Sequence, residues 1–397
     1  MNISERVKSI KESPTLAINS KAKELKQRGI DIINFCIGEP DFDTPKNIKD
    51  YAISSIKNGF TKYCPVTGTS EIKKAIINKF KKDNSILYKE NEIIISNGAK
   101  HSIYNIFQSI INVGDEVIVF APYWVSYIDI IVLSGGIPVI IETTDKNNFK
   151  INNDDIEKKI TKNTKAIIIN SPSNPTGMTY STEELKIIVK ICKKYNIFVI
   201  SDDIYERIIY DNNKFISILN IDQNIKDKTL IVNGVSKTYS MTGWRLGYTA
   251  GHRDIIAAMA KIQSQSTTCV SSISIKASSE ALSGTQEYVK HMVQEFEKRR
   301  NYIFKELSKI SGISCKKPNG SFYVFPNIVN FINKSFNGNK IKNDIDLSNY
   351  LLDTANIAVI PGSAFGANKH IRLSFATSIP IISEGIKRLK SALMLLK

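Results

Sequence analysis

Short apolar segments alternate with stretches of helical spacing between about residues 50 and 250. The apolar segments are rich in β-branched residues, and several are separated by patterns typical of amphipathic helices. This order predicts an α/β fold in which helices cover a mostly parallel sheet. The predicted strands are Glu92–Ser96, Glu116–Phe120, Ile137–Ile141, Ala166–Asn170, Ile197–Ser201, Leu230–Val232 and Leu246–Ala250.

One helix of this region has a clear predicted start. Its apolar residues follow the i, i+3, i+4, i+7, i+8 spacing of a single face from Ile103 to Ile111. The pattern begins directly after the turn Asn97-Gly98-Ala99, so free backbone N–H groups at a positive helix end are available to an anion. A glycine turn before a helix is weak evidence alone, because such turns are common.

The pattern changes after about residue 285, where longer helical stretches and shorter strands predict a smaller α+β domain. We therefore expect an N-terminal arm (1–14), a small domain (15–48 with 286–397) and a large domain (49–285). The C-terminal elements expected are a helix at Tyr288–Ser308, a strand at Phe322–Phe325, a helix at Leu347–Ala355, and strands at Ile357–Ile360 and Ile371–Phe375.

The composition argues against several functions. The 397 residues include 54 Lys and Arg against 38 Asp and Glu, and the net charge of +16 favours anionic partners. The lysines are scattered, without a basic patch or a DNA-binding motif, so we expect no nucleic-acid partner. Five separated cysteines and four isolated histidines lack metal-ligand spacing, which predicts no metal site and a reducing compartment.

Targeting signals are also missing from the sequence. The first 17 residues carry charges every few positions, and no apolar stretch approaches membrane-spanning length. The sequence therefore predicts a cytoplasmic protein without membrane association.

The segment Gly234–Gly247, GVSKTYSMTGWRLG, places Lys237 and Arg245 eight positions apart among small residues, between two predicted strands. A lysine that attacks a carbonyl must be partly desolvated and close to other cations, so that its amine is often neutral. A guanidinium suits a phosphate, because it offers two parallel donors. Without further context, the same two residues are equally typical of a solvated loop.

Two adjacent carboxylates, Asp202 and Asp203, follow the predicted strand Ile197–Ser201. Ligands of α/β folds bind at the carboxyl ends of strands, so either carboxylate could face a ligand. Either could instead cap a helix or form a salt bridge, and the alternation of side chains along a strand does not separate the two.

The segment around Lys237 resembles the cofactor-lysine signature of class I aminotransferases of fold type I, and the resemblance extends from about residue 5 to the C-terminus. It implies that Lys237 binds pyridoxal 5'-phosphate as a Schiff base and acts as the general base, in a ping-pong reaction. It also implies the roles of further residues: the turn Gly98, Ala99 and Lys100 and the guanidinium of Arg245 hold the phosphate, Trp124 stacks on the pyridine ring, Asp202 pairs with the ring nitrogen, and Asn174 and Tyr205 contact the ring oxygen.

The same resemblance implies residues for substrate binding and assembly. Arg372 matches the arginine that binds the substrate α-carboxylate, Gly38 borders the substrate, and Trp124 and Asn174 lie beside it as well. Tyr63 matches a tyrosine that reaches the phosphate of a neighbouring subunit, which implies a homodimer with shared active sites.

Within the family, the segments Ala121–Tyr127 and Met241–Arg245 look like the bacterial branch of aspartate aminotransferases, some of which also use prephenate. L-aspartate and 2-oxoglutarate are therefore the first expected substrates. The segment Ile262–Thr268 has no arginine where the animal-type enzymes supply one for the side-chain carboxylate. The candidates for this role are Lys11, Thr15 and Lys100, although Lys11 also suits an exposed arm.

Two alternatives remain open at this stage. One is another fold-type I enzyme that uses the same cofactor on a different amino acid, such as an aromatic or alanine aminotransferase or a lyase. The other is a cofactor-sensing regulator, for which a DNA-binding appendage before residue 15 is missing from the sequence.

Overall fold

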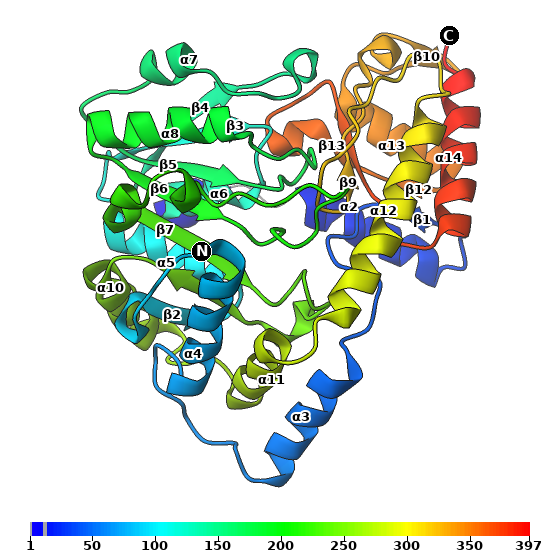
Figure 1. Ribbon diagram of the computed structural model, residues 1–397. Helices are drawn as coiled ribbons and strands as arrows, with labels where there is room; N and C mark the ends of the chain where they lie inside the picture. Colours follow the sequence, from blue (N-terminus) through cyan, green and yellow to red (C-terminus); the bar gives the residue numbers. More distant parts are fainter. Residues whose placement is uncertain (1, 11–13) are drawn as a thin grey trace.

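A seven-stranded sheet forms the centre of the larger part of the molecule (Figure 1). The computed structural model describes residues 2–10 and 14–397. The strand order is β2-β8-β7-β6-β5-β3-β4, and only β8 runs antiparallel to its neighbours. The mostly parallel sheet predicted from the sequence is thereby confirmed. The strands are β2 (Ile93–Ser96), β3 (Glu116–Ala121), β4 (Ile137–Glu142), β5 (Thr164–Asn170), β6 (Phe198–Asp202), β7 (Thr229–Gly234) and β8 (Gly247–Ala250).

Two apolar cores lie on the opposite faces of this sheet. Successive residues of a strand point to opposite faces, so in β3 Val117 and Val119 enter one core while Ile118 enters the other. Strands buried on both faces need near-continuous apolar runs, which is the pattern seen in the sequence. One core includes residues of α5 (Ala99–Ile110), α6 (Ser126–Leu133) and α10 (Arg253–Ser266); the other includes residues of α4 (Ser70–Lys79), α8 (Thr182–Tyr195) and α11 (Ser272–Ser283).

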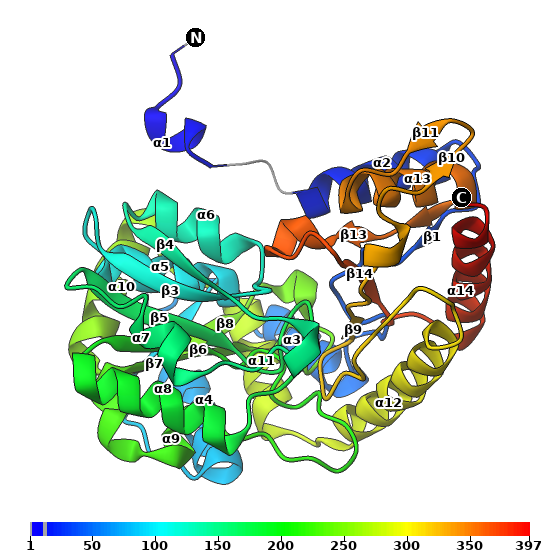
Figure 2. The same cartoon turned by 90° about the horizontal axis from the view of Figure 1, so that it is seen from above.

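The smaller part of the molecule lies to one side of this sheet, and Figure 2 shows it from above. Its antiparallel sheet has the order β13-β14-β9, and β1 pairs in parallel with β12. The smaller α+β region expected from the sequence is therefore present. Its elements are α2 (Pro14–Gln27), β1 (Ile33–Asn34), α12 (Glu287–Leu307), β9 (Tyr323–Val324), β10 (Ser335–Phe336), β11 (Asn339–Lys340), α13 (Asp344–Ala355), β12 (Ile357–Ala358), β13 (Ile360–Pro361), β14 (Ile371–Ser374) and α14 (Ile379–Met394).

The remaining helices connect or flank these two parts. The short helix α1 extends away from the body of the molecule, as Figure 2 shows. These helices are α1 (Glu5–Lys8), α3 (Lys46–Lys57), α7 (Asn153–Glu157) and α9 (Ile218–Ile221).

Candidate active site

A cavity of about 370 Å³ opens where the large sheet meets the smaller part of the molecule. It lies at the carboxyl ends of β5 and β6, where α/β folds place their ligands. We call it the catalytic cavity. Ten of the residues predicted from the sequence line it, although they span most of the chain: Gly38, Ala99, Lys100, Trp124, Asn174, Asp202, Tyr205, Lys237, Arg245 and Arg372.

Lys237 follows β7 and points its amine into the catalytic cavity. The Nζ atom donates a hydrogen bond of 2.5 Å to the carbonyl oxygen of Gly38. Burial lowers the pKa of Lys237 to about 8; Glu39 opposes this shift, while Arg245 and Arg372 add to it. The neutral amine is therefore more populated near neutral pH than in an ordinary lysine, as a nucleophile or a general base requires.

Asp202 ends β6 and is buried at the floor of the cavity. The hydroxyl of Tyr127 donates to its Oδ2 atom at 2.6 Å, and the amide of Asn170 donates to its backbone oxygen at 2.8 Å. Burial raises the pKa of Asp202 to about 6, against the opposing effect of the Tyr127 bond. A buried carboxylate without a directly paired cation favours a ligand that brings a positive nitrogen.

The neighbouring carboxylate, Asp203, lies outside the residues that line the cavity. The hydroxyl of Ser201 donates to it at 2.6 Å, and burial followed by the charge of Glu206 raises the pKa of Asp203 well above its usual range. Glu206 is itself paired with Lys79 in the protein interior. The structure therefore separates the two carboxylates that the sequence left equivalent: Asp202 faces the cavity and Asp203 belongs to a buried polar network.

A positively charged end of the cavity forms where Arg245 meets the first turn of α5. The guanidinium donates to the backbone oxygens of Thr242 at 2.8 Å and Asn97 at 3.3 Å. A Cβ atom at Gly98 would lie 2.3 Å from Nη2 of Arg245, and Gly98 has a φ of +91°. Only glycine fits both this contact and this backbone conformation. The guanidinium and the N–H groups of the helix start are donors of the kind that bind anions.

Lys100 adds a second cation beside this end. Its amine lies 5.0 Å from the centre of the Trp124 ring, and its side chain remains open to the cavity. The surrounding protein and then the charge of Arg245 lower the pKa of Lys100, while Asp129 opposes the shift. Trp124 also packs edge-on against Tyr127, at 5.3 Å between ring centres.

Arg372 closes the opposite side of the cavity from β14. Its Nη1 atom donates to Oδ1 of Asn174 at 3.0 Å, and Nη2 donates to the backbone oxygen of Cys36 at 2.9 Å. The side chain is buried, its Nε atom has no hydrogen-bond partner, and no carboxylate of residues 2–10 or 14–397 forms a salt bridge with it. A buried guanidinium without a counter-ion is costly, so this arrangement favours an anionic ligand.

The remaining predicted residues lie away from the catalytic cavity or beyond what the structure describes. Tyr63 is 91% exposed and is not among the residues that line the cavity. Lys11 lies outside the described residues, and Thr15 falls in α2 at a position whose side chain is not described.

Three residues that make notable contacts at the site were given no role from the sequence. Tyr127 holds Asp202, Asn170 holds the backbone of Asp202, and Tyr323 lines the cavity beneath Arg372. Asn170 ends β5, so its position at a strand end was the available signal, whereas Tyr127 lies in the first turn of α6, within a segment that the sequence singled out. Tyr323 lies in a two-residue strand of the smaller part and had no local signal.

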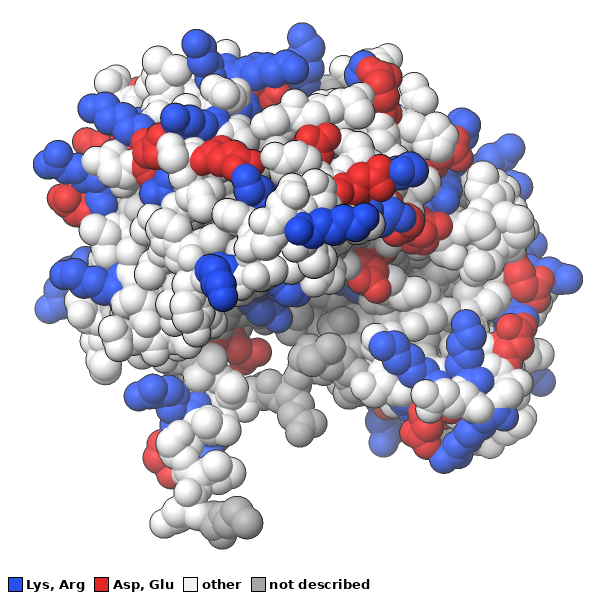
Figure 3. Space-filling model, turned by 90° about the horizontal axis from the view of Figure 1, so that it is seen from below, with Lys and Arg blue, Asp and Glu red and all other residues white. Residues whose placement is uncertain are grey.

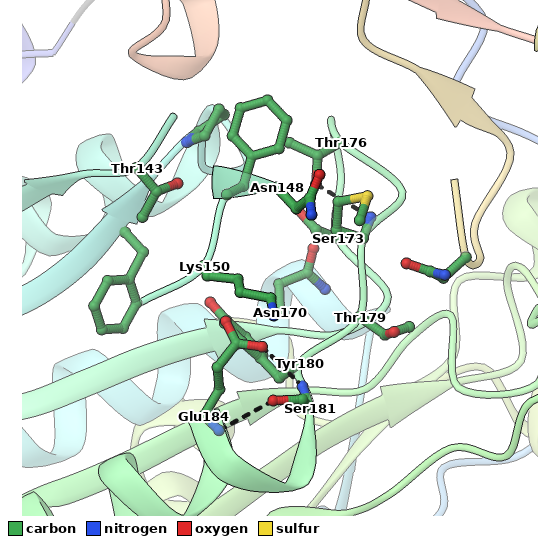
Figure 4. Close-up of a pocket in the computed structure, with 15 residues that line it drawn as sticks. Thr143, Asn148, Lys150, Asn170, Ser173, Thr176, Thr179, Tyr180, Ser181 and Glu184 are labelled. Atoms are coloured by element: carbon green, nitrogen blue, oxygen red, sulfur yellow. Dashed lines mark hydrogen bonds between the residues drawn. The ribbon is translucent and has the colours of Figure 1, made fainter. Parts of the chain in front are cut away.

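A second cavity, of about 320 Å³, also has Asn170 in its lining and is shown in Figure 4. We call it the side cavity. Its carboxylate, Glu184, accepts from the backbone N–H groups of Ile151 and Ser181, and the hydroxyl of Ser181 accepts from the N–H group of Glu184. These bonds form the cap of α8, so the strongest acceptor of this cavity is already occupied.

The surface carries charges of both signs. Figure 3 shows Lys and Arg interspersed with Asp and Glu over the face seen from below. Among the described side chains, no group of three or more His, Cys, Asp or Glu is placed to hold a metal ion. In the part of the chain that was searched, no helix has the length and apolar character needed to cross a membrane.

Comparisons with known proteins agree with this geometry. The chain matches the family described as aminotransferase class I and II over residues 30–389. It is 48% identical to an aspartate aminotransferase of Bacillus sp. (strain YM-2), with 98% of each chain covered, and 46% identical to an aspartate/prephenate aminotransferase of Nitrosomonas europaea, with 99% and 100% covered.

A solved structure shows the same fold throughout. The aspartate aminotransferase from Rhizobium meliloti superposes with a TM-score of 0.97, at 40% identity and with 100% of both chains covered. Fold, site geometry and sequence therefore agree on the family expected from the motifs. The protein belongs to the class I and II aminotransferases.

Proposed function

We propose that this protein transfers the α-amino group of L-aspartate to 2-oxoglutarate with pyridoxal 5'-phosphate as cofactor, and that prephenate is a further acceptor. The observation that carries the proposal is the buried guanidinium of Arg372, which has no carboxylate partner among the described residues and lines the same cavity as Lys237. The names of the relatives, aspartate aminotransferase and aspartate/prephenate aminotransferase, support the choice of substrates over an aromatic amino acid, alanine or a lyase reaction.

The residues of the cavity fit this cofactor. The contact between Gly98 and Arg245 leaves a guanidinium and helix N–H groups directed at one place, where a phosphate would bind. Asp202 is a buried acceptor for the ring nitrogen, Tyr205 and Asn174 would contact the ring oxygen, and Trp124 supplies a flat face. We place Ala99 and Lys100 at the phosphate end as well, because both line the cavity beside Arg245.

When bound, the cofactor supplies an electron-withdrawing ring and a reactive carbonyl carbon. Lys237 would hold the cofactor covalently and, once released, would move a proton from the substrate α-carbon, for which a pKa of about 8 is suitable. Asp202 would keep a proton on the ring nitrogen, because a buried anion stabilises a nearby positive charge.

Substrate carboxylates would bind at two places. Arg372 and Asn174 would hold the α-carboxylate next to Gly38, because the guanidinium already contacts Asn174 and the backbone near Gly38. Lys100 is the described cation that remains for the side-chain carboxylate, since its amine is open to the cavity. Lys11 and Thr15 stay as candidates for the same role.

The proposal includes the domain division and assembly expected from the sequence: an arm (1–14), a small domain (15–48 and 286–397) and a large domain (49–285). Arg372 belongs to the small domain and Asn174 to the large one, so a bound carboxylate would draw the two together and exclude water.

The exposed ring of Tyr63 supports a homodimer in which it reaches the partner's site. We place this enzyme in the cytoplasm.

A visible absorption spectrum of the purified protein with added pyridoxal phosphate tests the proposal. We expect a coloured complex whose visible band disappears when L-aspartate is added and returns when 2-oxoglutarate follows. Initial rates should give parallel double-reciprocal lines, because the first product leaves before the acceptor binds.

Three outcomes would contradict separate parts of the proposal. A protein that stays colourless and takes up no cofactor would overturn the whole assignment. A band that L-aspartate leaves unchanged, while alanine or an aromatic amino acid removes it, would overturn the donor. A band restored by 2-oxoglutarate but not by prephenate would remove prephenate alone.

A further inference from the structure

Tyr323 lines the catalytic cavity from β9 and is 1% exposed. It has no place in the roles assigned so far. Its side chain contacts two residues that do have such roles, one on the face of its ring and one at its hydroxyl group. The two contacts point to a single function.

The ring of Tyr323 supports the guanidinium of Arg372. The guanidinium carbon lies 4.4 Å from the centre of the Tyr323 ring, and the ring of Phe365 lies 5.2 Å away from the same carbon. Aromatic rings attract a cation through their negative faces, and more strongly when the cation is desolvated. Because Arg372 lacks a carboxylate partner among the described residues, these rings contribute to holding it in place.

The hydroxyl of Tyr323 lies 3.0 Å from the hydroxyl of Tyr205. Burial raises the pKa of Tyr205 well above its usual range, with Tyr323 adding to the shift, and burial also raises the pKa of Tyr323. Both phenols therefore keep their protons near neutral pH. Since each has one proton, the Tyr205 proton is available to a ligand oxygen, while the two hydroxyls stay hydrogen-bonded, only when Tyr323 is the donor between them.

We propose that Tyr323 is a positioning residue that couples the substrate clamp to the cofactor contact: its ring holds Arg372, and its hydroxyl donates to Tyr205 so that Tyr205 donates into the cavity. This inference rests on the function proposed above. A chain of two hydrogen bonds strengthens the second bond, because the first polarises the hydroxyl between them. Tyr323 thus supports both the residue that would bind the substrate carboxylate, Arg372, and the residue that would contact the ring oxygen, Tyr205.

Two substitutions separate the parts played by the ring and the hydroxyl. Tyr323→Phe keeps the ring and removes the hydroxyl, whereas Tyr323→Leu removes both. Tyr350→Phe is the matched control, because Tyr350 is also buried and its hydroxyl donates to the backbone oxygen of Ala392, away from the cavity. Circular dichroism and thermal melting would check that each variant folds.

The first readout is the pH midpoint at which the visible band of the cofactor-loaded protein changes. A donor to the ring oxygen withdraws electron density, so the nitrogen joined to Lys237 loses its proton at a lower pH. We expect Tyr323→Phe to raise this midpoint by about half a unit, the size of one weakened hydrogen bond. Tyr350→Phe should leave the midpoint unchanged.

The second readout is the KM for L-aspartate and for 2-oxoglutarate. We expect Tyr323→Phe to change both by less than about twofold, and Tyr323→Leu to raise both about tenfold through loss of the ring beneath Arg372. An unchanged midpoint in Tyr323→Phe would overturn the hydroxyl's role, and unchanged KM values in a folded Tyr323→Leu would overturn the ring's role. Failure of the proposed function would look different, because the wild-type protein itself would then show no visible band.

Discussion

The catalytic cavity and the side cavity are neighbours of similar size, about 370 and 320 Å³, and both are bordered by Asn170. They differ in whether their charged groups already have partners within the protein. In the catalytic cavity Lys237, Asp202 and Arg372 have displaced pKa values or an unmatched charge. In the side cavity the carboxylate of Glu184 is held by two backbone N–H groups.

The comparison shows that volume does not identify a functional site in this protein. Glu184 completes the cap of α8, and its bonds would have to be broken before a ligand could use it. Asp202 and Arg372 still have unmet interactions, so a ligand improves their environment. Ligand binding is thus favoured where the fold has left buried charge uncompensated.

The largest expected effect is on Lys237. Lys237→Ala should lower transamination on the order of 10⁴-fold, because it removes both the covalent attachment and the base. The variant should still bind pyridoxal phosphate through Arg245 and α5, which equilibrium dialysis would measure. Turnover close to that of the wild type would show that Lys237 is not needed for the reaction, and the catalytic cavity would then have no better claim to be the active site than the side cavity.

A smaller loss is expected for Arg372→Lys. Lysine keeps the charge but offers no parallel pair of donors, and it cannot reach Asn174 and the Cys36 backbone together. We expect kcat/KM for L-aspartate to fall about 10²-fold, mostly through KM. Steady-state kinetics would check this, and a fall confined to kcat would contradict a clamp for the α-carboxylate.

Asp202→Asn should change how the stability of the apoprotein depends on pH. The folded protein binds the Asp202 proton more tightly than the unfolded chain does, since burial raises its pKa to about 6 from 3.8. The wild type therefore loses stability as the pH rises from about 4 to about 6, by at most about 3 kcal/mol.

The asparagine variant lacks this loss and should be the more stable apoprotein at pH 7, while binding the cofactor more weakly. Urea unfolding at pH 4, 5, 6 and 7 would measure the difference. If the free energies of unfolding of the two proteins changed in parallel with pH, the ionised Asp202 carboxylate would not destabilise the apoprotein, and the prediction would be wrong.

The smallest effect is expected in the side cavity. Lys150 is its exposed cation, and no described acceptor forms a salt bridge with it. Lys150→Ala should leave kcat and KM within about twofold of the wild type, as a surface substitution away from the site does. A tenfold change in either constant would give the side cavity a role in the reaction.

The sequence predicted the sheet well because each strand is a local pattern. All seven strands begin and end within two residues of the predicted bounds, since apolar runs buried on both faces are recognisable from neighbouring residues alone. The role proposed for Lys237 came from the resemblance of the segment Gly234–Gly247 to the signature of class I aminotransferases, because the small residues around this lysine are by themselves equally typical of a solvated loop.

The contacts between distant segments were not predictable in this way. Arg372 donates to Asn174, and Tyr323 lies within hydrogen-bond distance of Tyr205, so each contact joins the smaller part of the molecule to the larger part. The choice between Asp202 and Asp203 needed the observed direction of each side chain at the end of β6. Such facts depend on the packing of the whole molecule and have no local pattern.

The contact between Gly98 and Arg245 has a consequence for how the enzyme can change over evolution or in the laboratory. A methyl group at position 98 would lie 2.3 Å from the guanidinium, so even alanine would displace the arginine. Substitution at this end of the cavity is therefore constrained, because both Gly98 and the position of Arg245 have to be kept. New substrate preferences would have to be selected at the opposite side of the cavity, around Tyr323 and Arg372, while the Gly98–Arg245 contact keeps the reacting atoms aligned with Lys237.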